Sequence, residues 1–301
     1  MNGPLGLIGV PSSLGGPGRG TEEGPRWLRS AGLVARLRET GIEVHDLGDV
    51  PLPEAGLTAW PELAGIDALA LLVRARASTA IQEGMLPVIL GGDHTVALGA
   101  IAASAAAYPN LGILWVDAHP DFNTPGTSKS GHPHGMVLAL AAGLGPTGSL
   151  ARLGRTPLVL PQRICVLGAR SIDESERALL ATSGVRLATT SEVIRDGPGE
   201  AVAEAARYLA GHGADALHLS IDLDVLDPSE YPGVSTPAPH GFNLDDLRSV
   251  MEAACTEMNV VSLDLVELTP THDHGERTTR AGVAVLEAVA AALLDAPFRE
   301  P

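Results

Sequence analysis

Two kinds of segment alternate along the chain. Short continuous apolar runs predict buried strands, and longer stretches with apolar residues three and four positions apart predict helices. The predicted strands cover residues 5–10, 42–50, 86–90, 111–116, 163–168, 185–188, 216–222 and 260–266. The predicted helices cover residues 25–37, 68–83, 96–108, 134–142, 173–181, 198–210, 244–256 and 278–294.

Strands that alternate with helices in this way predict an α/β fold, in which a mostly parallel sheet carries helices on both faces. The chain has 301 residues, of which 45% are apolar, and this is ample for one large core. No internal repeat or change of composition divides the sequence, so we expect a single domain over residues 1–301. Residues 51–65 and 143–161, which are rich in proline or glycine, are predicted to be connections.

The net charge of −16 makes nucleic acids and acidic membranes poor partners for this chain. The sequence contains no apolar run of 18 residues that would cross a bilayer, and the first ten residues do not have a signal-peptide pattern. The two cysteines, Cys165 and Cys255, lie in apolar surroundings and predict buried thiols rather than a disulfide framework. We therefore expect a cytoplasmic protein.

Potential metal ligands follow three of the predicted strands. Because sites in parallel α/β sheets form beyond the carboxyl ends of the strands, these side chains are expected to converge. Within each motif, residues two apart on extended chain point to the same side. The six candidate ligands are His94, Asp117, His119, Asp121, Asp222 and Asp224.

This set of ligand types favours particular metals. Oxygen-rich sites with an occasional imidazole suit Mn²⁺ or Mg²⁺, and the absence of cysteine ligands argues against a structural zinc site. Six ligands are too many for one ordinary site, whereas two ions that share bridging carboxylates would use all of them. Each motif alone is common in turns, but the three together predict a binuclear metal site.

Three segments resemble the signatures of the ureohydrolase family, in the same order and over nearly the whole chain: Leu90-Gly-Gly-Asp-His94, Asp117-Ala-His-Pro-Asp121 and Ser220-Ile-Asp-Leu-Asp-Val-Leu-Asp-Pro228. That family hydrolyses guanidino groups to urea at a dimanganese centre. The resemblance implies an arginase-like three-layer α/β/α fold, two Mn²⁺ per chain, and a homo-oligomer that is a trimer or a hexamer. It implies that one ion is bound by His94, Asp117, Asp121 and Asp222, and the other by His119, Asp117, Asp222 and Asp224.

The loop from Asn123 to Gly135 resembles the loop with which arginases hold the amino-acid end of arginine. The resemblance implies a hydrolase acting on linear amidines that converts L-arginine to L-ornithine and urea. Hydroxyl and amide donors suit a carboxylate, and a carboxylate suits an ammonium. The implied substrate contacts are Asn123, Ser128 and Ser130 to the α-carboxylate, Asp173 to the α-ammonium, and Glu176 nearby. His132 stands at a substrate-contacting position where arginases usually have Asn, so the fine fit of the substrate stays open.

The resemblance also implies a mechanism, in which a metal-bridging hydroxide attacks the guanidinium carbon. Asp121 would accept its proton and pass it to the leaving amine. Glu267 would pair with the guanidinium, whose planar fork suits a carboxylate. Thr236 would help to orient the guanidinium, and His134 would be the proton shuttle, since the pKa of an imidazole is naturally near the working range.

Three alternatives remain from the sequence. A related amidinohydrolase acting on agmatine or another guanidino compound would not need the α-carboxylate loop. A metal-dependent deacetylase shares the arginase-like fold, but we would expect it to use a single zinc and to have no need of Asp224. A non-catalytic metal-binding protein would have no need of Glu267 and His134.

Overall fold

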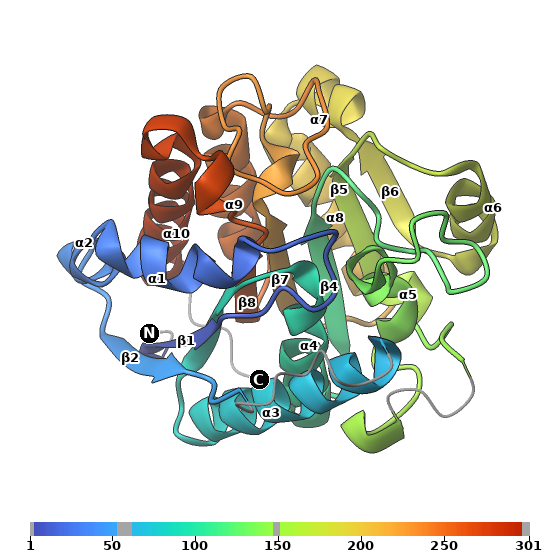
Figure 1. The fold of residues 1–301 in the computed structure, drawn as a ribbon, viewed down its shortest axis with the longest axis horizontal. Coiled ribbons are helices and arrows are strands. Elements are labelled where there is room, and N and C mark those ends of the chain that lie inside the picture. The colour runs from blue at the N-terminus through green and yellow to red at the C-terminus, as the bar shows by residue number, and fades with distance from the viewer. Residues whose placement is uncertain (1–2, 53–61, 147–150, 297–301) are drawn as a thin grey trace.

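The computed structural model describes residues 3–52, 62–146 and 151–296. Its centre is a parallel sheet of eight strands in the order β2-β1-β3-β8-β7-β4-β5-β6 (Figure 1). The strands are β1 Leu5–Val10, β2 Val44–Asp49, β3 Leu86–Gly91, β4 Leu111–Val116, β5 Ile164–Ala169, β6 Arg186–Thr189, β7 Ala216–Asp222 and β8 Val260–Val266. Every pair of neighbours is parallel, which confirms the predicted sheet type.

The described helices are α1 Gly24–Ser30, α2 Leu33–Glu39, α3 Glu62–Gln82, α4 Ala97–Ala107, α5 Val137–Ala141, α6 Glu174–Ser183, α7 Thr190–Asp196, α8 Pro198–Gly211, α9 Leu244–Glu257 and α10 Arg277–Asp295. Helices α1, α2, α8, α9 and α10 share a core with one face of the sheet. Helices α3, α4 and α5 share their cores with the other face, so the fold has three layers. Figure 1 shows α9 and α10 on the side of the sheet opposite to α3 and α4.

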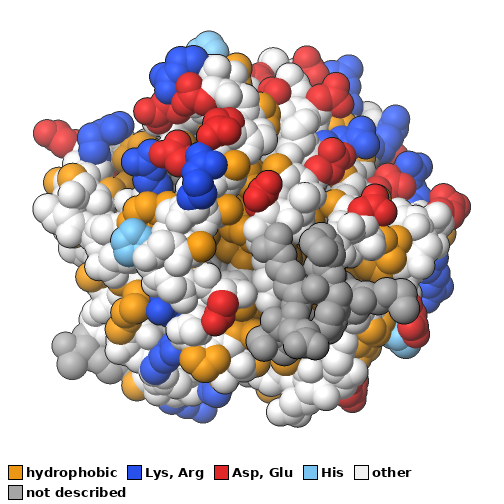
Figure 2. Space-filling view, turned by 180° about the vertical axis from the view of Figure 1, so that it is seen from behind, with side chains coloured by type: hydrophobic (Ala, Val, Ile, Leu, Met, Phe, Trp, Pro, Cys, Tyr) orange, Lys and Arg blue, Asp and Glu red, His pale blue; other side chains and the backbone are white. Residues whose placement is uncertain are grey.

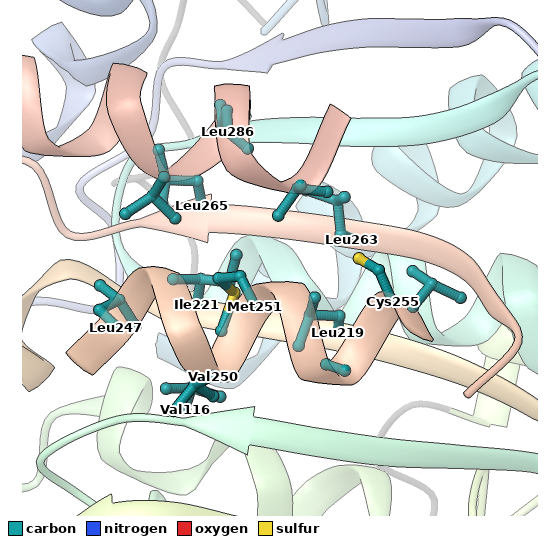
Figure 3. Packing of buried hydrophobic residues seen from close by; sticks show 14 of the residues in the cluster. Val116, Leu219, Ile221, Leu247, Val250, Met251, Cys255, Leu263, Leu265 and Leu286 are labelled. Atoms are coloured by element: carbon teal, nitrogen blue, oxygen red, sulfur yellow. The ribbon is translucent and has the colours of Figure 1, made fainter. Parts of the chain in front are cut away.

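The strands alternate between these two cores with the period of two that a strand imposes. On β4, Leu114 and Val116 join the core that contains α9 and α10, whereas Ile113 and Trp115 join the core that contains α4 and α5. Figure 3 shows the first of these cores, where the α9 residue Met251 lies over the strands β7 and β8. The continuous apolar runs of the sequence therefore arise because both faces of the sheet are buried.

Both cysteines are fully buried, as the sequence predicts. Cys255 of α9 is part of the core drawn in Figure 3, and Cys165 lies in β5. Burial raises the pKa of both thiols to about 12, so they stay protonated at neutral pH. Protonated buried thiols behave as small apolar side chains.

Three predicted elements differ from the structure, and one helix was not predicted. The predicted helix over residues 25–37 is wrong as one helix, because Gly32 has a left-handed backbone (φ 86°) that separates α1 from α2. The predicted connection over residues 51–65 is wrong from residue 62 onward, where α3 has begun, and residues 53–61 lie outside the described chain. The predicted helix over residues 134–142 begins as a 3₁₀ turn over Pro133–Met136 before α5. The sequence analysis missed α7, although Thr189 and Glu192 form a capping box at its start.

On the face shown in Figure 2, acidic and basic side chains are interspersed over the described surface rather than gathered into separate patches. This face therefore does not offer the stripe of positive charge that nucleic acids require. Within the described residues, no helix has both the length and the apolar character needed to cross a bilayer.

Candidate metal centre and active site

The carboxyl ends of five adjacent strands, β3, β8, β7, β4 and β5, supply the candidate site. His94 follows β3, Glu267 follows β8, and Asp222 ends β7. Asp117 follows β4, and Asp173 follows β5 as the N-cap of α6. The sheet therefore brings together segments that are up to 173 residues apart in sequence, as the contact between His94 and Glu267 shows.

Two groups of potential ligands lie side by side. In the first, His94 Nδ1 lies 3.2 Å from Asp117 Oδ2, 3.2 Å from Asp121 Oδ2 and 3.1 Å from Asp222 Oδ2. In the second, His119 Nδ1 lies 2.9 Å from Asp224 Oδ2 and 3.5 Å from Asp117 Oδ1. Asp117 belongs to both groups, as a carboxylate bridging two ions would. All six side chains that the sequence singled out as ligands therefore converge.

The spacing of the aspartates produces local contacts that hold their carboxylates in place. The backbone N–H of His119 donates to Asp117 Oδ1 (2.7 Å), and the N–H of Asp224 donates to Asp222 Oδ1 (2.7 Å). Both contacts reach from a side chain to the backbone two residues later, which is the geometry of an Asx turn. The indole of Trp115 adds a hydrogen bond to Asp117 Oδ2 (2.9 Å).

The electrostatics of the cluster show how closely its charges are confined. Burial, followed by repulsion from Asp117, raises the pKa of Asp121 to about 6. Burial, with repulsion from Asp224 and Asp117, raises the pKa of Asp222 well above its ordinary value. Burial alone would lower the pKa of His94, but the carboxylates around its ring raise it well above normal. These groups compete for protons because like charges lie close together in a buried place.

The residues present fit divalent cations. His94 Nδ1 is buried and has no hydrogen-bond partner among the described residues, although three carboxylate oxygens surround it. An orphaned ring nitrogen facing carboxylates is explained by a bound cation, because buried polar atoms are otherwise paired. The charge also agrees: four ionised aspartates carry −4, and two divalent ions would carry +4.

The other ring nitrogen of His94 begins a buried line of hydrogen bonds that runs through the interior of the sheet. His94 Nε2 contacts Ser220 Oγ (2.8 Å), Ser220 donates to Asp264 Oδ1 (2.7 Å), and Asp264 Oδ2 contacts His218 Nε2 (2.8 Å). His218 Nδ1 contacts Ser262 Oγ at 2.7 Å. Ser104 of α4 donates to the same oxygen, also at 2.7 Å. All these side chains are fully buried, so the line fixes the ring orientation of His94 from within the core.

Two site residues have strained backbone. Asp121 has φ 49° and Glu267 has φ 66°, in the left-handed region that residues other than glycine rarely adopt. Such conformations cost about 1–3 kcal/mol and persist where the surrounding structure enforces them. Here they turn the chain directly after a ligand motif and after β8, which aims both carboxylates at the site.

The carboxylate of Glu267 has three partners at the site. Its Oε1 accepts from the backbone N–H of His94 (2.9 Å) and lies 2.9 Å from His134 Nδ1, and its Oε2 accepts from Ser235 (2.5 Å). Burial alone would lower the pKa of His134, but the charge of Glu267 raises it to about 9. His134 is therefore protonated at neutral pH and is placed to give a proton. The pKa of Glu267 is in turn lowered by His134, against the effect of its burial.

A cavity of about 290 Å³ opens above the cluster. Its lining residues are His119, Asp121, Asn123, Ser130, His132, His134, Gly135, Ser171, Ile172, Asp173, Glu176, Asp222, Asp224 and Thr236. This list contains eleven of the predicted site residues. Thr236 donates to Asp224 Oδ2 (3.1 Å), which places its hydroxyl beside the second ligand group. The cavity is thus acidic at its floor and bounded at its rim by small polar side chains.

Several predicted residues lie elsewhere. His94 and Asp117 are buried beneath the cavity and, like Ser128 and Glu267, are not among its lining residues. Glu176 lines the cavity, but its Oε1 accepts from the N–H of Phe122 (2.8 Å) and its other oxygen from the N–H of Asp173. Burial raises the pKa of Glu176 to about 7. Glu176 thus also joins the start of α6 to the chain beside Asp121.

The loop after β1 lies against the candidate site. The backbone N–H of Gly15 donates to Asp93 Oδ2 (3.1 Å), and the N–H of His134 donates to the carbonyl of Gly15 (3.1 Å). A Cβ at Gly15 would lie 2.2 Å from the side chain of Thr95, so the approach requires glycine. The carboxylate of Asp93 also accepts from the N–H of Thr95 (2.9 Å). Asp93 therefore joins the loop after β1 to the turn that carries His94.

Sequence reasoning missed the rim residues Ser171 and Ile172 and the buried line behind His94. Both follow β5 in an irregular segment, and nothing in the sequence marks Ile172. The buried line did leave a signal. His218 and Ser220 in β7, and Ser262 and Asp264 in β8, are polar residues two apart inside otherwise apolar strands.

Comparisons with known proteins agree with this geometry. A model described as the Arginase family matches residues 4–291. The chain is 36% identical over 292 residues to the arginase of Bacillus subtilis (strain 168), and the match covers 96% of this chain and 98% of that protein. It resembles the native arginase structure of Bacillus caldovelox with a TM-score of 0.89 and 35% identity, covering 96% and 98% of the two chains. It also resembles the Entamoeba histolytica arginase in complex with L-ornithine, with a TM-score of 0.85 and 29% identity over 96% and 99% of the chains.

The contact between His134 and Glu267 predicts a pH-dependent contribution to stability. Because Glu267 raises the pKa of His134 to about 9, the contribution is fully present below the ordinary value of about 6.5 and is lost as the pH rises through about 9. Glu267→Gln should therefore lower the free energy of unfolding of the metal-free protein by about 2 kcal/mol at pH 7, and by much less at pH 10. Urea denaturation over this pH range measures the difference.

Ser235→Ala is the matched control, because it removes a neutral donor to Glu267 and leaves both charged groups in place. The decrease in the free energy of unfolding caused by Ser235→Ala should stay constant between pH 7 and pH 10. If the decrease caused by Glu267→Gln is equally constant, Glu267 and His134 are not paired as ions.

Proposed function

This chain belongs to the arginase family, and on that premise we propose that it hydrolyses L-arginine to L-ornithine and urea. The observation that carries the proposal is the pair of ligand groups sharing Asp117 beneath the 290 Å³ cavity. The floor brings the reacting group of a substrate to the two ligand groups, and the rim offers donors and a carboxylate to an amino-acid end. A substrate charged at both ends matches a cavity that is polar at both ends.

We propose that the two ligand groups hold two Mn²⁺ ions, the first at His94, Asp117, Asp121 and Asp222, and the second at His119, Asp117, Asp222 and Asp224. Each set combines one imidazole with carboxylates, and carboxylate-rich donor sets suit manganese. Two divalent ions held by these residues would supply a nucleophilic hydroxide at neutral pH.

At the rim, we assign the α-carboxylate of the substrate to Asn123, Ser128 and Ser130, and the α-ammonium to Asp173. The hydroxyl of Thr127 donates to Asn123 Oδ1 (3.0 Å), which directs the amide NH₂ group of Asn123 away from that contact. Ser130 and Asp173 line the cavity on segments that meet at its mouth. Recognition of both charged groups would hold the substrate at a fixed depth above the floor.

Two side chains would move the protons of the reaction. Asp121, which lines the cavity beside His94, accepts the proton of the attacking hydroxyl and passes it to the leaving amine nitrogen. His134 then gives its proton to that amine, which leaves as an ammonium, and is protonated again by solvent. Glu267 keeps His134 protonated through their 2.9 Å contact.

The predicted contacts to the guanidinium group are less direct. Thr236, which donates to Asp224, lies in the cavity and would orient the guanidinium through its hydroxyl. Pairing of Glu267 with the guanidinium stays a prediction, because it requires a carboxylate oxygen to turn from Ser235 or His134 toward the cavity.

We further propose that the protein is a cytoplasmic homo-oligomer, either a trimer or a hexamer. Membership of the arginase family supports the assembly, and the two buried free thiols are compatible with a reducing compartment. Light scattering of the purified protein measures the number of subunits.

The metal assignment predicts two manganese ions per chain. Elemental analysis of protein reconstituted with Mn²⁺ should give a ratio of two, and chelation should abolish urea release. Asp224→Ala should reduce the ratio toward one, because Asp224 belongs only to the second group. Asp227→Asn changes an acid outside both groups and should leave two ions. One zinc per chain with full activity in the absence of manganese would exclude a dimanganese centre.

The proton-transfer assignment predicts that Asp121→Asn lowers kcat by about 10²-fold or more. Asparagine keeps an oxygen ligand but cannot accept the proton, so much of the manganese should stay bound. Asp173→Asn makes the same chemical change at the mouth of the cavity and should raise KM while leaving kcat close to that of the wild type. Steady-state kinetics with L-arginine measures both. A wild-type kcat in Asp121→Asn would remove Asp121 from the mechanism.

The rim assignment predicts that L-arginine is preferred over agmatine and 4-guanidinobutyrate. Agmatine lacks the carboxylate, and a site built to hydrogen-bond a group rejects an analogue without it by up to about 10⁴-fold. The measurement is kcat/KM for urea release from the three compounds. A higher value for agmatine or guanidinobutyrate would reject L-arginine as the substrate and leave the metal-dependent hydrolysis of guanidino groups standing.

A further inference from the structure

Lys129 is the one lysine of the chain, and it lies in the loop that borders the cavity. Its Nζ lies 3.0 Å from Asp173 Oδ1. Asp173 lines the cavity and is the side chain assigned above to the α-ammonium of the substrate. An ammonium group of the protein therefore already occupies the partner that the substrate ammonium needs.

The ion pair between Lys129 and Asp173 is exposed enough for either side chain to change its partner. The side chain of Lys129 is 70% exposed and that of Asp173 is 35% exposed, so water screens the pair and it opens at little cost. Lys129 also stands between Ser128 and Ser130, two of the residues assigned to the α-carboxylate. An ammonium displaced from Asp173 on its flexible stem is therefore released beside the place where that carboxylate binds.

From this placement, and resting on the proposed function, we propose that Lys129 is a specificity-determining residue that selects substrates with an α-amino acid end by exchanging ion pairs. In the free protein Lys129 pairs with Asp173. When L-arginine binds, its α-ammonium takes Asp173, and Lys129 turns to the α-carboxylate. One ion pair is broken and two are formed.

The same exchange disfavours agmatine. Agmatine carries the ammonium without the carboxylate, so its binding also displaces Lys129 from Asp173 but gives Lys129 no new partner. Lys129 therefore strengthens the binding of L-arginine and weakens the binding of agmatine. A carboxylate can also accept hydrogen bonds from the neutral donors Asn123, Ser128 and Ser130. These donors favour its binding, but they do not compete with an ammonium for Asp173.

A purely structural role predicts something different. If the ion pair only fastened the loop to α6, its loss would weaken the binding of both compounds in the same direction. A second contact fastens the same two segments without charge, because Ser175 Oγ of α6 donates to the carbonyl of Thr127 (3.1 Å). Ser175→Ala is therefore a matched control for loosening of the loop.

The experiment compares the wild type, Lys129→Gln, Lys129→Arg and Ser175→Ala as full-length manganese-loaded proteins. For Lys129→Gln we expect KM to rise about threefold for L-arginine and to fall about threefold for agmatine, the scale of an exposed ion pair, with kcat unchanged. The preference for L-arginine should then fall about tenfold. Lys129→Arg keeps the charge and should restore most of the preference. Ser175→Ala should move KM for both compounds in the same direction.

Binding of L-ornithine and putrescine, measured by calorimetry, tests the inference without turnover. Putrescine lacks the α-carboxylate of L-ornithine, just as agmatine lacks that of L-arginine. Lys129→Gln should therefore weaken the binding of L-ornithine and strengthen the binding of putrescine. Opposite shifts support the exchange even if the wild type prefers another guanidino substrate, an outcome that would reject only the arginine assignment. Equal shifts for the two ligands, or no shift, would overturn the exchange and leave Lys129 as a surface ion pair.

Discussion

Four aspartate carboxylates are buried together with the imidazole of His94 at the centre of this molecule, and the half-buried imidazole of His119 lies beside them. The surrounding structure depends on that confinement of negative charge. Buried carboxylates are strongly disfavoured unless charge or hydrogen bonds compensate them. Arg170 lies near the cluster, but its guanidinium donates to the backbone carbonyls of Asp224 and Ala238. Backbone N–H groups orient the carboxylates without neutralising them. The surrounding carboxylates raise the pKa of His94 and of His119, so these imidazoles offset part of the charge. Two bound divalent cations would offset all of it, and the fold can be understood as a rigid frame for such ions.

Much of this frame could be predicted from the sequence, because the relevant signals are local. A buried strand followed by Asp-x-His-x-Asp places ligands at a strand end whatever the neighbouring strands are. The order of the strands is not local, since β3 pairs with β8 and β4 with β7 across long stretches of chain. For that reason the candidate ligands could be chosen from the sequence, but not their mutual distances. The helix break at Gly32 was missed because glycine also occurs within helices.

The contacts behind and beside the ligands could not be predicted, and the reason lies in sheet register. His218 is aligned with Ser262, and Ser220 with Asp264, across the pairing of β7 with β8. Without that register, four polar residues in two apolar strands have no evident partners. Glu267 is similar, because its left-handed backbone turns its carboxylate toward His134, and a sequence pattern does not disclose such a conformation. The exchange at Lys129 likewise depends on a contact between segments 44 residues apart.

The buried line from His94 to Ser104 limits the routes by which this protein can evolve. Each of its hydroxyl and imidazole groups is a partner of the next, so an apolar replacement at one position leaves a buried polar atom unpaired at its neighbour. Replacing such a network of buried polar groups by apolar side chains of the same shape is often neutral for stability, yet single substitutions reach that state only through intermediates with unpaired polar atoms. Substitutions in the interior of the sheet are thereby coupled to His94, a proposed metal ligand. Related proteins that keep His94 should keep all the polar residues of this line, whereas those that lose it can replace them with apolar residues.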